Sequence, residues 1–420
     1  MLYRGTNSNK SKTRFYILGF LFINVVINYM DRSNISIAAT SISKELSLSP
    51  FELGLIFSAF GWAYAALQIP GGILADRVSP RFLYSAILVA WSVSTLLQGV
   101  LSGFITLFLL RLATGAFEAP AYPTNNKIVS SWFPLKERAS AIAVYTSGQF
   151  IGLAFLTPAL TALQYYLGWQ WLFIITGMVG IVWGIAWYFL YRDAPKDDFA
   201  EPDRTIMNHS ATRQSTFTWD NFKKVFSYRK LWGIYLGQFC LTSTLWFFLT
   251  WFPTYLSQYR HIDILKSGFL ASIPFLGAFV GILMSGFLSD RLLKKGKSLA
   301  YSRKFPVISG LLLSTAMIGA NYTSDTGLII FFMTLAFLGN GVASISWVFV
   351  SSLSPPGLIG LTGGVFNFFG NLSSIFIPIV VGYLARNGDF DLAVVFISLM
   401  GIVGACCYVF LVGKMNESKH

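Results

Sequence analysis

Long apolar runs separated by short polar segments recur along almost the whole chain of 420 residues. A helix of about 20 apolar residues crosses a hydrocarbon core about 30 Å thick. Twelve runs fit this pattern, so the sequence predicts an all-α membrane protein with twelve transmembrane helices. The predicted spans are 15–39, 51–75, 82–103, 104–128, 138–163, 168–192, 230–256, 265–291, 302–322, 326–352, 357–386 and 390–412.

One long polar segment, residues 193–229, divides the runs into two sets of six. We predict an internal duplication, with pseudo-symmetric six-helix bundles at 1–192 and 230–420 and a cytoplasmic linker between them. In transporters built this way the substrate path lies at the interface of the repeats.

A similar motif closes the second helix of each half, at about half the chain's length from its copy. Glycine permits close helix contact, and the acidic and basic side chains can bind neighbouring helix ends. We therefore predict that the two motifs latch a closed inner gate, although an ordinary solvated helix terminus is the alternative. The gating residues are Gly72, Asp76 and Arg77 in the first half and Asp290 and Arg291 in the second, where the motif begins at Gly286.

Composition supports the membrane assignment, since 12% of residues are charged and 54% are hydrophobic, whereas soluble domains carry about 25% charged residues. The net charge of +13 does not indicate nucleic-acid binding, because most Lys and Arg residues lie in alternate loops. The opposite loops hold only Lys44, Arg260, Lys266 and Arg386. By the positive-inside rule both termini are expected to be cytoplasmic.

No targeting or cofactor signal changes this picture. The first apolar run lacks a small-residue cleavage pattern and is expected to be a retained helix. The cysteines, Cys240, Cys406 and Cys407, all fall within predicted helices and suggest neither a disulfide framework nor a metal site. The three histidines lie in loops or the tail, so a histidine proton relay is not expected.

Four charged residues lie deep inside two predicted helices of the first half: Asp31, Arg32, Arg111 and Glu118. A charge near the bilayer centre costs roughly 2.5–3.5 kcal/mol on insertion scales, so such residues usually line an aqueous path or pair with each other. Arg111 and Glu118 are two turns apart on one helical face. These residues make the chain a transporter candidate.

The cluster suggests proton coupling, because desolvation and a neighbouring arginine act on a buried carboxyl in opposite directions. One added proton gives the otherwise neutral cluster a single positive charge, which suits one substrate carboxylate. We assign Glu118 as the substrate-linked proton site and Asp31, paired with Arg111, as a second titrating group. Arg32 would bind the carboxylate through its planar fork. Two static ion pairs are the alternative.

The predicted helices of the second half carry no charge at depth but do carry Gln238, Asn340, Asn367 and Asn371. Amides and hydroxyls suit a polyhydroxylated acid without the desolvation cost of a charge. We expect this half to recognise the substrate. Trp246, Trp251 and Tyr255, near the outer end of the seventh helix, are expected in an interfacial aromatic belt.

Several segments resemble a known family. The segment GGILADRVSPR at 71–81 resembles the signature loop of the major facilitator superfamily. The segments NYMDRSN at 28–34, RLATGAFEAPAYPTNN at 111–126, SSWFPLKERASA at 130–141 and LIGLTGGVFNFFGNL at 358–372 are similar to the anion:cation symporters. The resemblance is closest to bacterial proton-coupled carriers of D-galactonate, glucarate or hexuronates. It implies an inner-membrane monomer without a cofactor, driven by the proton gradient. It also implies substrate contacts at Tyr29, Tyr64, Gln149, Ser344, Ser346, Trp347 and Asn367.

Other functions fit the sequence less well. An enzyme would need a nucleophile, a metal set or a base at catalytic spacing, and no such pattern occurs. A channel suits duplicated halves less well than alternating access does, and a receptor would need a sizeable soluble domain. Within transport, the alternatives to a sugar acid are tartrate, an aromatic acid, sialic acid, or phosphate and its esters.

Overall fold

The computed structural model describes residues 6–193, 219–355 and 357–413, and within these ranges the secondary structure is helical with no strand. The described residues divide into two compact units. The first comprises those within Met1–Ser47 and Ala59–Asp203, and the second those within Leu48–Ser58 and Arg204–His420. Each unit is described by itself below. Residues 194–218 of the predicted linker lie outside the described ranges.

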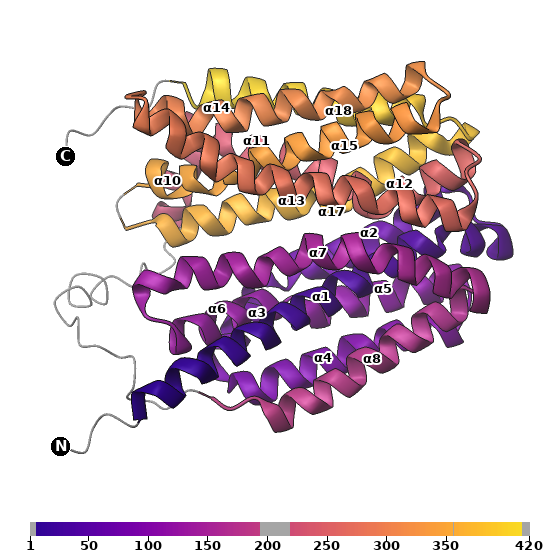
Figure 1. Cartoon of the computed structure of the whole chain (residues 1–420), viewed down its shortest axis with the longest axis horizontal. Helices are drawn as coiled ribbons and strands as arrows, with labels where there is room; N and C mark the ends of the chain where they lie inside the picture. Colours follow the sequence, from indigo (N-terminus) through magenta and orange to yellow (C-terminus); the bar gives the residue numbers. More distant parts are fainter. Residues whose placement is uncertain (1–5, 194–218, 356, 414–420) are drawn as a thin grey trace. The chain divides into compact units, whose positions relative to one another are not determined.

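The first unit contains helices α1 to α8, which run side by side in Figure 1. The helix α2 has residues in both units, since Pro50–Ser58 belongs to the second. Their bounds are α1 Thr6–Leu46, α2 Pro50–Ala66, α3 Gln68–Arg77, α4 Pro80–Val100, α5 Phe104–Glu118, α6 Ala121–Trp132, α7 Leu135–Leu167 and α8 Trp169–Leu190.

The second unit begins with a short amphipathic helix, α10, and continues through α11 to α18 (Figure 1). Several of its spans end in short 3₁₀ or π segments, labelled η. The bounds are α10 Trp219–Ser227, α11 Arg229–Thr250, α12 Phe252–Thr254, η2 Tyr255–Tyr259, α13 Ile264–Lys294, α14 Leu299–Ser314, η3 Thr315–Tyr322, α15 Thr326–Ala343, η4 Ser344–Trp347, α16 Val348–Leu353, α17 Ile359–Leu384, η5 Ala385–Asn387, α18 Asp391–Cys406 and η6 Cys407–Leu411.

The predicted membrane fold is confirmed by the lengths and apolarity of these helices. Ten described segments are long and apolar enough to span a bilayer, and the bent pair α2 and α3 makes an eleventh. The helix α11 has 22 residues and is therefore about 33 Å long at 1.5 Å per residue. It brings the segments of spanning length to twelve, although Gln238, Thr242, Ser243 and Thr244 make it more polar than most.

The same packing order recurs in the two units, as a duplication requires. In the first unit the first span packs on the fifth (α1 on α7), the third on the sixth (α4 on α8) and the third on the fourth (α4 on α5). In the second unit the corresponding pairs are α11 on α17, α14 on α18 and α14 on α15. Matching span order and matching partners support the pseudo-symmetric halves.

Basic residues repeat the symmetry at the helix ends. At the start of α4, Arg81 Nε donates to the carbonyl of Tyr188 at the end of α8, over 2.7 Å. At the start of α14, Lys304 Nζ donates to the carbonyls of Tyr408, over 3.2 Å, and of Gly413 at the end of the last span. A cation stabilises the carbonyl end of a helix dipole, so each unit ties its third span to its sixth.

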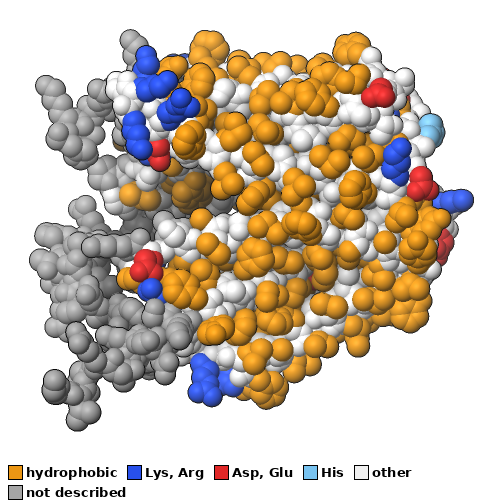
Figure 2. Space-filling view, viewed as in Figure 1, with side chains coloured by type: hydrophobic (Ala, Val, Ile, Leu, Met, Phe, Trp, Pro, Cys, Tyr) orange, Lys and Arg blue, Asp and Glu red, His pale blue; other side chains and the backbone are white. Residues whose placement is uncertain are grey.

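Large apolar side chains cover the outside of each unit. On the face shown in Figure 2, hydrophobic side chains fill the middle of each unit and charged side chains lie near the helix ends. Phe155 and Phe189 in the first unit are 69% and 70% exposed, and Phe287 in the second is 69% exposed. Exposed apolar surface on this scale is typical of a lipid-facing protein.

The predicted aromatic belt on the seventh span is wrong. Trp246, Trp251 and Tyr255 are buried within the second unit, and Trp251 Nε1 donates to the carbonyl of Pro378 in α17 over 3.1 Å. These side chains form interior packing, because the indole donor finds its partner in a neighbouring helix.

Two spans of the first unit break near the charged cluster. The second bends by 51° between α2 and α3, where Pro70 has no N–H to donate to the carbonyl of Ala66. The fourth is interrupted between Glu118 and Ala121, where Pro120 likewise lacks a donor. These breaks place Glu118 at the last residue of α5 rather than inside a continuous helix.

Candidate functional site

The four buried charges predicted from the sequence all lie in the first unit, on α1 and α5. Asp31 is 1% exposed, Arg32 7%, Arg111 2% and Glu118 0%. The structure therefore brings them together in the interior of one unit, as the apolar context of both helices predicted. The one predicted pairing, of Asp31 with Arg111, is not observed.

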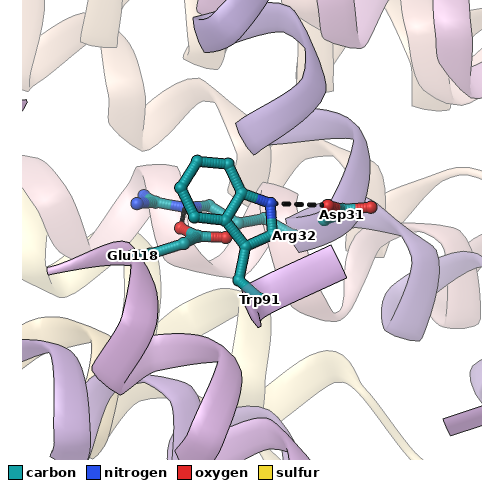
Figure 3. A network of polar contacts seen from close by, with 4 residues as sticks. All are labelled: Asp31, Arg32, Trp91 and Glu118. Atoms are coloured by element: carbon teal, nitrogen blue, oxygen red, sulfur yellow. Dashed lines mark hydrogen bonds and ion pairs between the residues drawn. The ribbon is translucent and has the colours of Figure 1, made fainter. Parts of the chain in front are cut away.

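Arg32 and Glu118 form a direct ion pair. Arg32 Nε donates to Glu118 Oε2 over 2.9 Å, and Figure 3 shows the two side chains meeting between α1 and α5. A charge-assisted bond of this length between buried groups is strong, and removing one partner leaves the other charge uncompensated. The predicted anion-binding arginine is thus held by the predicted proton site.

Aromatic rings surround the Arg32 guanidinium. Its Cζ atom lies 4.9 Å from the ring centre of Tyr29, 4.7 Å from that of Phe60 and 5.0 Å from that of Tyr64. The Cζ atom of Arg111 lies 5.2 Å from the same Phe60 ring. Cation–π contacts of this kind stabilise a guanidinium away from water, so the rings stabilise both guanidiniums inside the unit.

Asp31 faces a different neighbour. Trp91 Nε1 of α4 donates to Asp31 Oδ2 over 3.0 Å, and in Figure 3 the Asp31 carboxylate points away from the Arg32 guanidinium. The predicted pairing with Arg111 is wrong, since Arg111 makes no ion pair with any residue that the structure describes. Arg111 still acts electrostatically on both Asp31 and Glu118.

Several donors and acceptors of the cluster remain without a hydrogen-bond partner among the described residues. They are Asp31 Oδ1, Arg32 Nη2, Glu118 Oε1, and Nε and Nη1 of Arg111. Leaving such buried groups unpaired costs about 1–3 kcal/mol each, more when they are charged. This arrangement suits a ligand or proton site better than a finished structural ion-pair network.

The predicted substrate residues of the second unit gather around η4. Ser346 is buried and its hydroxyl donates to Gln238 Oε1 of α11 over 3.0 Å. Trp347 is 49% exposed and stands edge-on to Phe366 of α17, with ring centres 5.2 Å apart. Ser344 is exposed on the same 3₁₀ turn. A 3₁₀ stretch within a helix often marks a functional hinge.

The remaining predicted contacts lie on continuous helices. Asn367 is an exposed side chain of α17, and Gln149 is a half-buried side chain of α7 in the first unit. Asn340, by contrast, donates to the carbonyl of Leu241 over 2.7 Å, which is a helix-to-helix bond.

The gating motif is held by a residue that the sequence analysis did not assign to it. Lys127 of α6 donates through Nζ to the carbonyls of Ala75, Asp76 and Val78, at 2.7, 3.0 and 3.0 Å. These carbonyls end α3, where a cation is favoured by the helix dipole. The sequence offered one signal for this role, because Lys127 is a charged residue within the predicted helix 104–128.

The latching role of the charged side chains of the motif stays a prediction. Those of Asp76, Arg77, Asp290 and Arg291 are exposed. The close-contact role of Gly72 is wrong, because a Cβ atom there would meet nothing within 4 Å, and the same holds for Gly286. The close approach is made by the preceding Gly71, whose Cβ position lies 3.0 Å from the Pro120 nitrogen.

Sequence reasoning also missed Trp91 and Phe60. Trp91 holds Asp31, and Phe60 stands beside both guanidiniums. Both residues are far from the charged residues along the sequence. They come into contact only through the rotation of the packed helices, so the sequence contained no signal for either. Among the described residues no group of three His, Cys, Asp or Glu side chains could hold a metal ion.

A duplicated bundle of membrane-spanning helices, with opposite charges buried in one half, defines a polytopic transporter. The chain belongs to the Major Facilitator Superfamily, which it matches over residues 21–378. It is 50% identical to a D-galactonate transporter of Escherichia coli O6:H1, with 97% of each chain covered. It is 40% identical to a probable galactarate/D-glucarate transporter, GudP, of Bacillus subtilis, covering 97% of this chain and 94% of that one.

The fold has a solved counterpart as well. A bacterial homologue of the human lysosomal transporter Spinster aligns with a TM-score of 0.78 and 20% identity, covering 96% of this chain and 97% of that one. The family and these relatives make the protein a transporter and not an enzyme.

Proposed function

We propose that the protein is a proton-coupled symporter of a sugar acid of the D-galactonate, galactarate or glucarate type. Its relatives that carry such names support the substrate class. The observation that carries the coupling is the buried Arg32–Glu118 ion pair. Because the pair is neutral while both groups are charged, a proton on Glu118 would release Arg32 to bind one substrate carboxylate.

The unpaired atoms of the cluster suit this exchange. Arg32 keeps Nη2 free of a described partner while Nε is bound to Glu118, so the guanidinium has a second edge for an incoming carboxylate. A planar, two-edged donor binds carboxylate in a bidentate geometry that lysine lacks. Arg111 and the Asp31 carboxylate would complete the charge balance as a second titrating set.

Neutral polar side chains would bind the part of the substrate beyond its carboxylate. The exposed side chains of Ser344, Trp347 and Asn367, with Gln149 and the tyrosines Tyr29 and Tyr64, provide donors, acceptors and a ring face. We propose alternating access in a bacterial inner membrane, with both termini cytoplasmic, a single chain as the working unit and the proton gradient in place of a cofactor.

Another organic anion or a phosphate compound is the second candidate. A phosphate ester would favour at least two arginines without acidic partners. Here Arg32 is paired with Glu118 and Arg111 is influenced by both carboxylates, which favours a singly charged acid. A dicarboxylate would require both acids to be protonated.

A substrate screen followed by transport tests the proposal. Purified protein would be screened by thermal shift against aldonates, uronates, aldarates, tartrate and phosphate esters, and the ligand that stabilises it would then be offered to proteoliposomes. We expect D-galactonate or a related acid to accumulate against its gradient only when the outside is more acidic. Accumulation that ignores the pH gradient would contradict proton coupling, and stabilisation only by a phosphate ester would contradict the substrate class.

A further inference from the structure

A stripe of polar side chains follows α1 away from the Arg32 pair. Asn24, Asn28 and Asp31 are spaced four and three residues apart and therefore share one helical face. They are 0%, 2% and 1% exposed. Asp31 ends this stripe on the side of α1 where Trp91 lies, and its carboxylate points away from Arg32 (Figure 3).

Side chains of the neighbouring helices extend the stripe. The Tyr84 hydroxyl of α4 lies near Asn24 of α1 and Asn125 of α6. Tyr84 and Trp91 are seven residues, or two turns, apart on α4. Asn24 and Asp31 have the same spacing on α1, so the two pairs of side chains can lie at matching levels. Asn28 lies between these levels and near Glu118.

The atoms along this route are buried but incompletely bonded. Within the part of the chain that the structure describes, Asn24 Nδ2, both amide atoms of Asn28, Asp31 Oδ1 and Asn125 Oδ1 have no hydrogen-bond partner. Apolar side chains would fill a static interior at lower cost. Groups of this kind commonly bind buried water, with about three bonds per molecule.

We propose that this polar column carries the proton between Asp31 and the cytoplasmic ends of α1 and α4. The proposal rests on the proton coupling and topology proposed above. The O–H bond of the Asp31 carboxylic acid breaks as an O–H bond to water forms. The carboxylate remains behind, and bound waters relay one proton. The amides do not ionise; they hold the waters in line.

The charges around Asp31 leave this route open. Towards Asp31, α4 presents the neutral Trp91, and α5 presents Arg111 and Glu118. Along the column, α8 contributes Trp183, whose Nε1 donates to Asn24 Oδ1 over 2.6 Å. Neither Lys nor Arg occurs on α1 between Asn24 and Asp31, so no cation on that stretch opposes a passing proton.

The test separates proton movement from substrate movement in proteoliposomes that contain a pH-sensitive dye. Asn28→Leu and Asn24→Leu would remove the water-binding amides. We expect substrate-driven proton influx to fall at least about tenfold, equivalent to about 1.4 kcal/mol in barrier, while counterflow of D-galactonate at equal pH changes little. Asn28→Ser, which can still bind water, should recover most of the proton flux.

Asn34→Leu is the matched control. Asn34 is a buried asparagine on the same helix, three residues beyond Asp31 at the far end from Asn24, and its Nδ2 donates to Thr176 Oγ1 over 2.8 Å. We expect this variant to keep the wild-type ratio of proton influx to counterflow. An equal fall of that ratio in Asn34→Leu, or an unchanged ratio in both column variants, would overturn the proposal.

Counterflow also reports correct folding. If Asn28→Leu loses counterflow as well, the test passes to Asn24→Leu, which is two turns from Asp31. The ratio of proton influx to counterflow in that variant then decides. If both leucine variants lose counterflow, Asn28→Ser and Asn28→Ala decide instead: the proposal requires a higher ratio for serine, and equal ratios overturn it. A wild-type protein without substrate-driven proton influx would contradict the proposed function itself.

Discussion

Arg32 is held by two kinds of contact, the carboxylate of Glu118 and the faces of three aromatic rings. Lysine at this position would keep the charge but lose the planar fork and much of the ring contact. We expect Arg32→Lys to raise the apparent KM for the substrate about 10- to 100-fold, since bonds to charged groups contribute about 1.5–3 kcal/mol. Uptake measured over a range of substrate concentrations gives the value.

Arg14→Lys provides the matched control for that substitution. Arg14 Nη1 also pairs with a glutamate, Glu137, over 3.0 Å, but the two side chains are 18% and 45% exposed. Exposed pairs contribute about 0–1 kcal/mol, so transport should be nearly unchanged. Arg14 also lies over aromatic rings, with its Cζ atom 5.0 Å from the ring centre of Phe15 and 5.8 Å from that of Phe133, so equal effects of the two substitutions would show that burial adds nothing at Arg32.

Asp31 and Trp91 should behave as one unit in stability. Trp91→Phe keeps a ring but leaves Asp31 Oδ2 without its donor, whereas Trp91→Phe together with Asp31→Asn also removes the charge. We expect a coupling of about 1–2 kcal/mol in a double-mutant cycle measured by unfolding in detergent. Additive losses would contradict the buried hydrogen bond.

Trp169→Phe tests whether any indole–carboxylate bond has this effect. Trp169 Nε1 donates to Glu45 Oε2 over 2.7 Å, where Glu45 is an exposed residue at the end of α1. Water can replace that bond, so a smaller coupling with Glu45→Gln is expected.

At the scale of single elements, the distance between α5 and α2 sets the position of Phe60. The Phe60 ring in turn contacts the guanidiniums of Arg32 and Arg111. A Cβ atom on Gly115 would lie 2.2 Å from the backbone oxygen of Phe60, so alanine there must push the helices apart. We expect Gly115→Ala to lower thermal stability and transport together. Gly19→Ala on α1, where nothing lies within 4 Å of the Cβ position, should be tolerated in both assays.

Lys127 makes a second prediction at this scale. Its three bonds to the carbonyls that end α3 tie α6 to the gating motif. We expect Lys127→Met to destabilise the protein by about 1.5–3 kcal/mol, the range for bonds to charged groups, as measured by thermal unfolding. Lys44→Met, at an exposed end of α1, removes a charge without such bonds. A similar loss in both would contradict the capping role.

The sequence predicted much at this scale but not the breaks within spans. Hydrophobic runs located the membrane helices because each run must cover about 30 Å of hydrocarbon. The bend at Leu67 and the 3₁₀ turn at Ser344–Trp347 depend on local hydrogen bonding that run length does not report. The partners of Asp31 and Arg32 depend on helix rotation, so the four charges were predictable while their pairing was not.

At the scale of the whole molecule, the two duplicated units are expected to have different roles. The described spans of the first unit hold the charged cluster, while the positions around η4 and α17 in the second hold neutral polar groups. The account therefore predicts that coupling resides in the first unit and substrate choice in the second. Asn367→Ala should weaken apparent affinity while leaving the number of protons per substrate unchanged, as read from the reversal potential of transport.

The central claim is that Glu118 exchanges its bond to Arg32 for a proton when substrate binds. Glu118→Gln protein in proteoliposomes tests it most directly, with uphill uptake driven by a pH gradient and counterflow measured side by side. The account predicts that glutamine, which cannot release a proton, abolishes uphill uptake while counterflow survives. Uphill, proton-dependent uptake by the Glu118→Gln protein would contradict it.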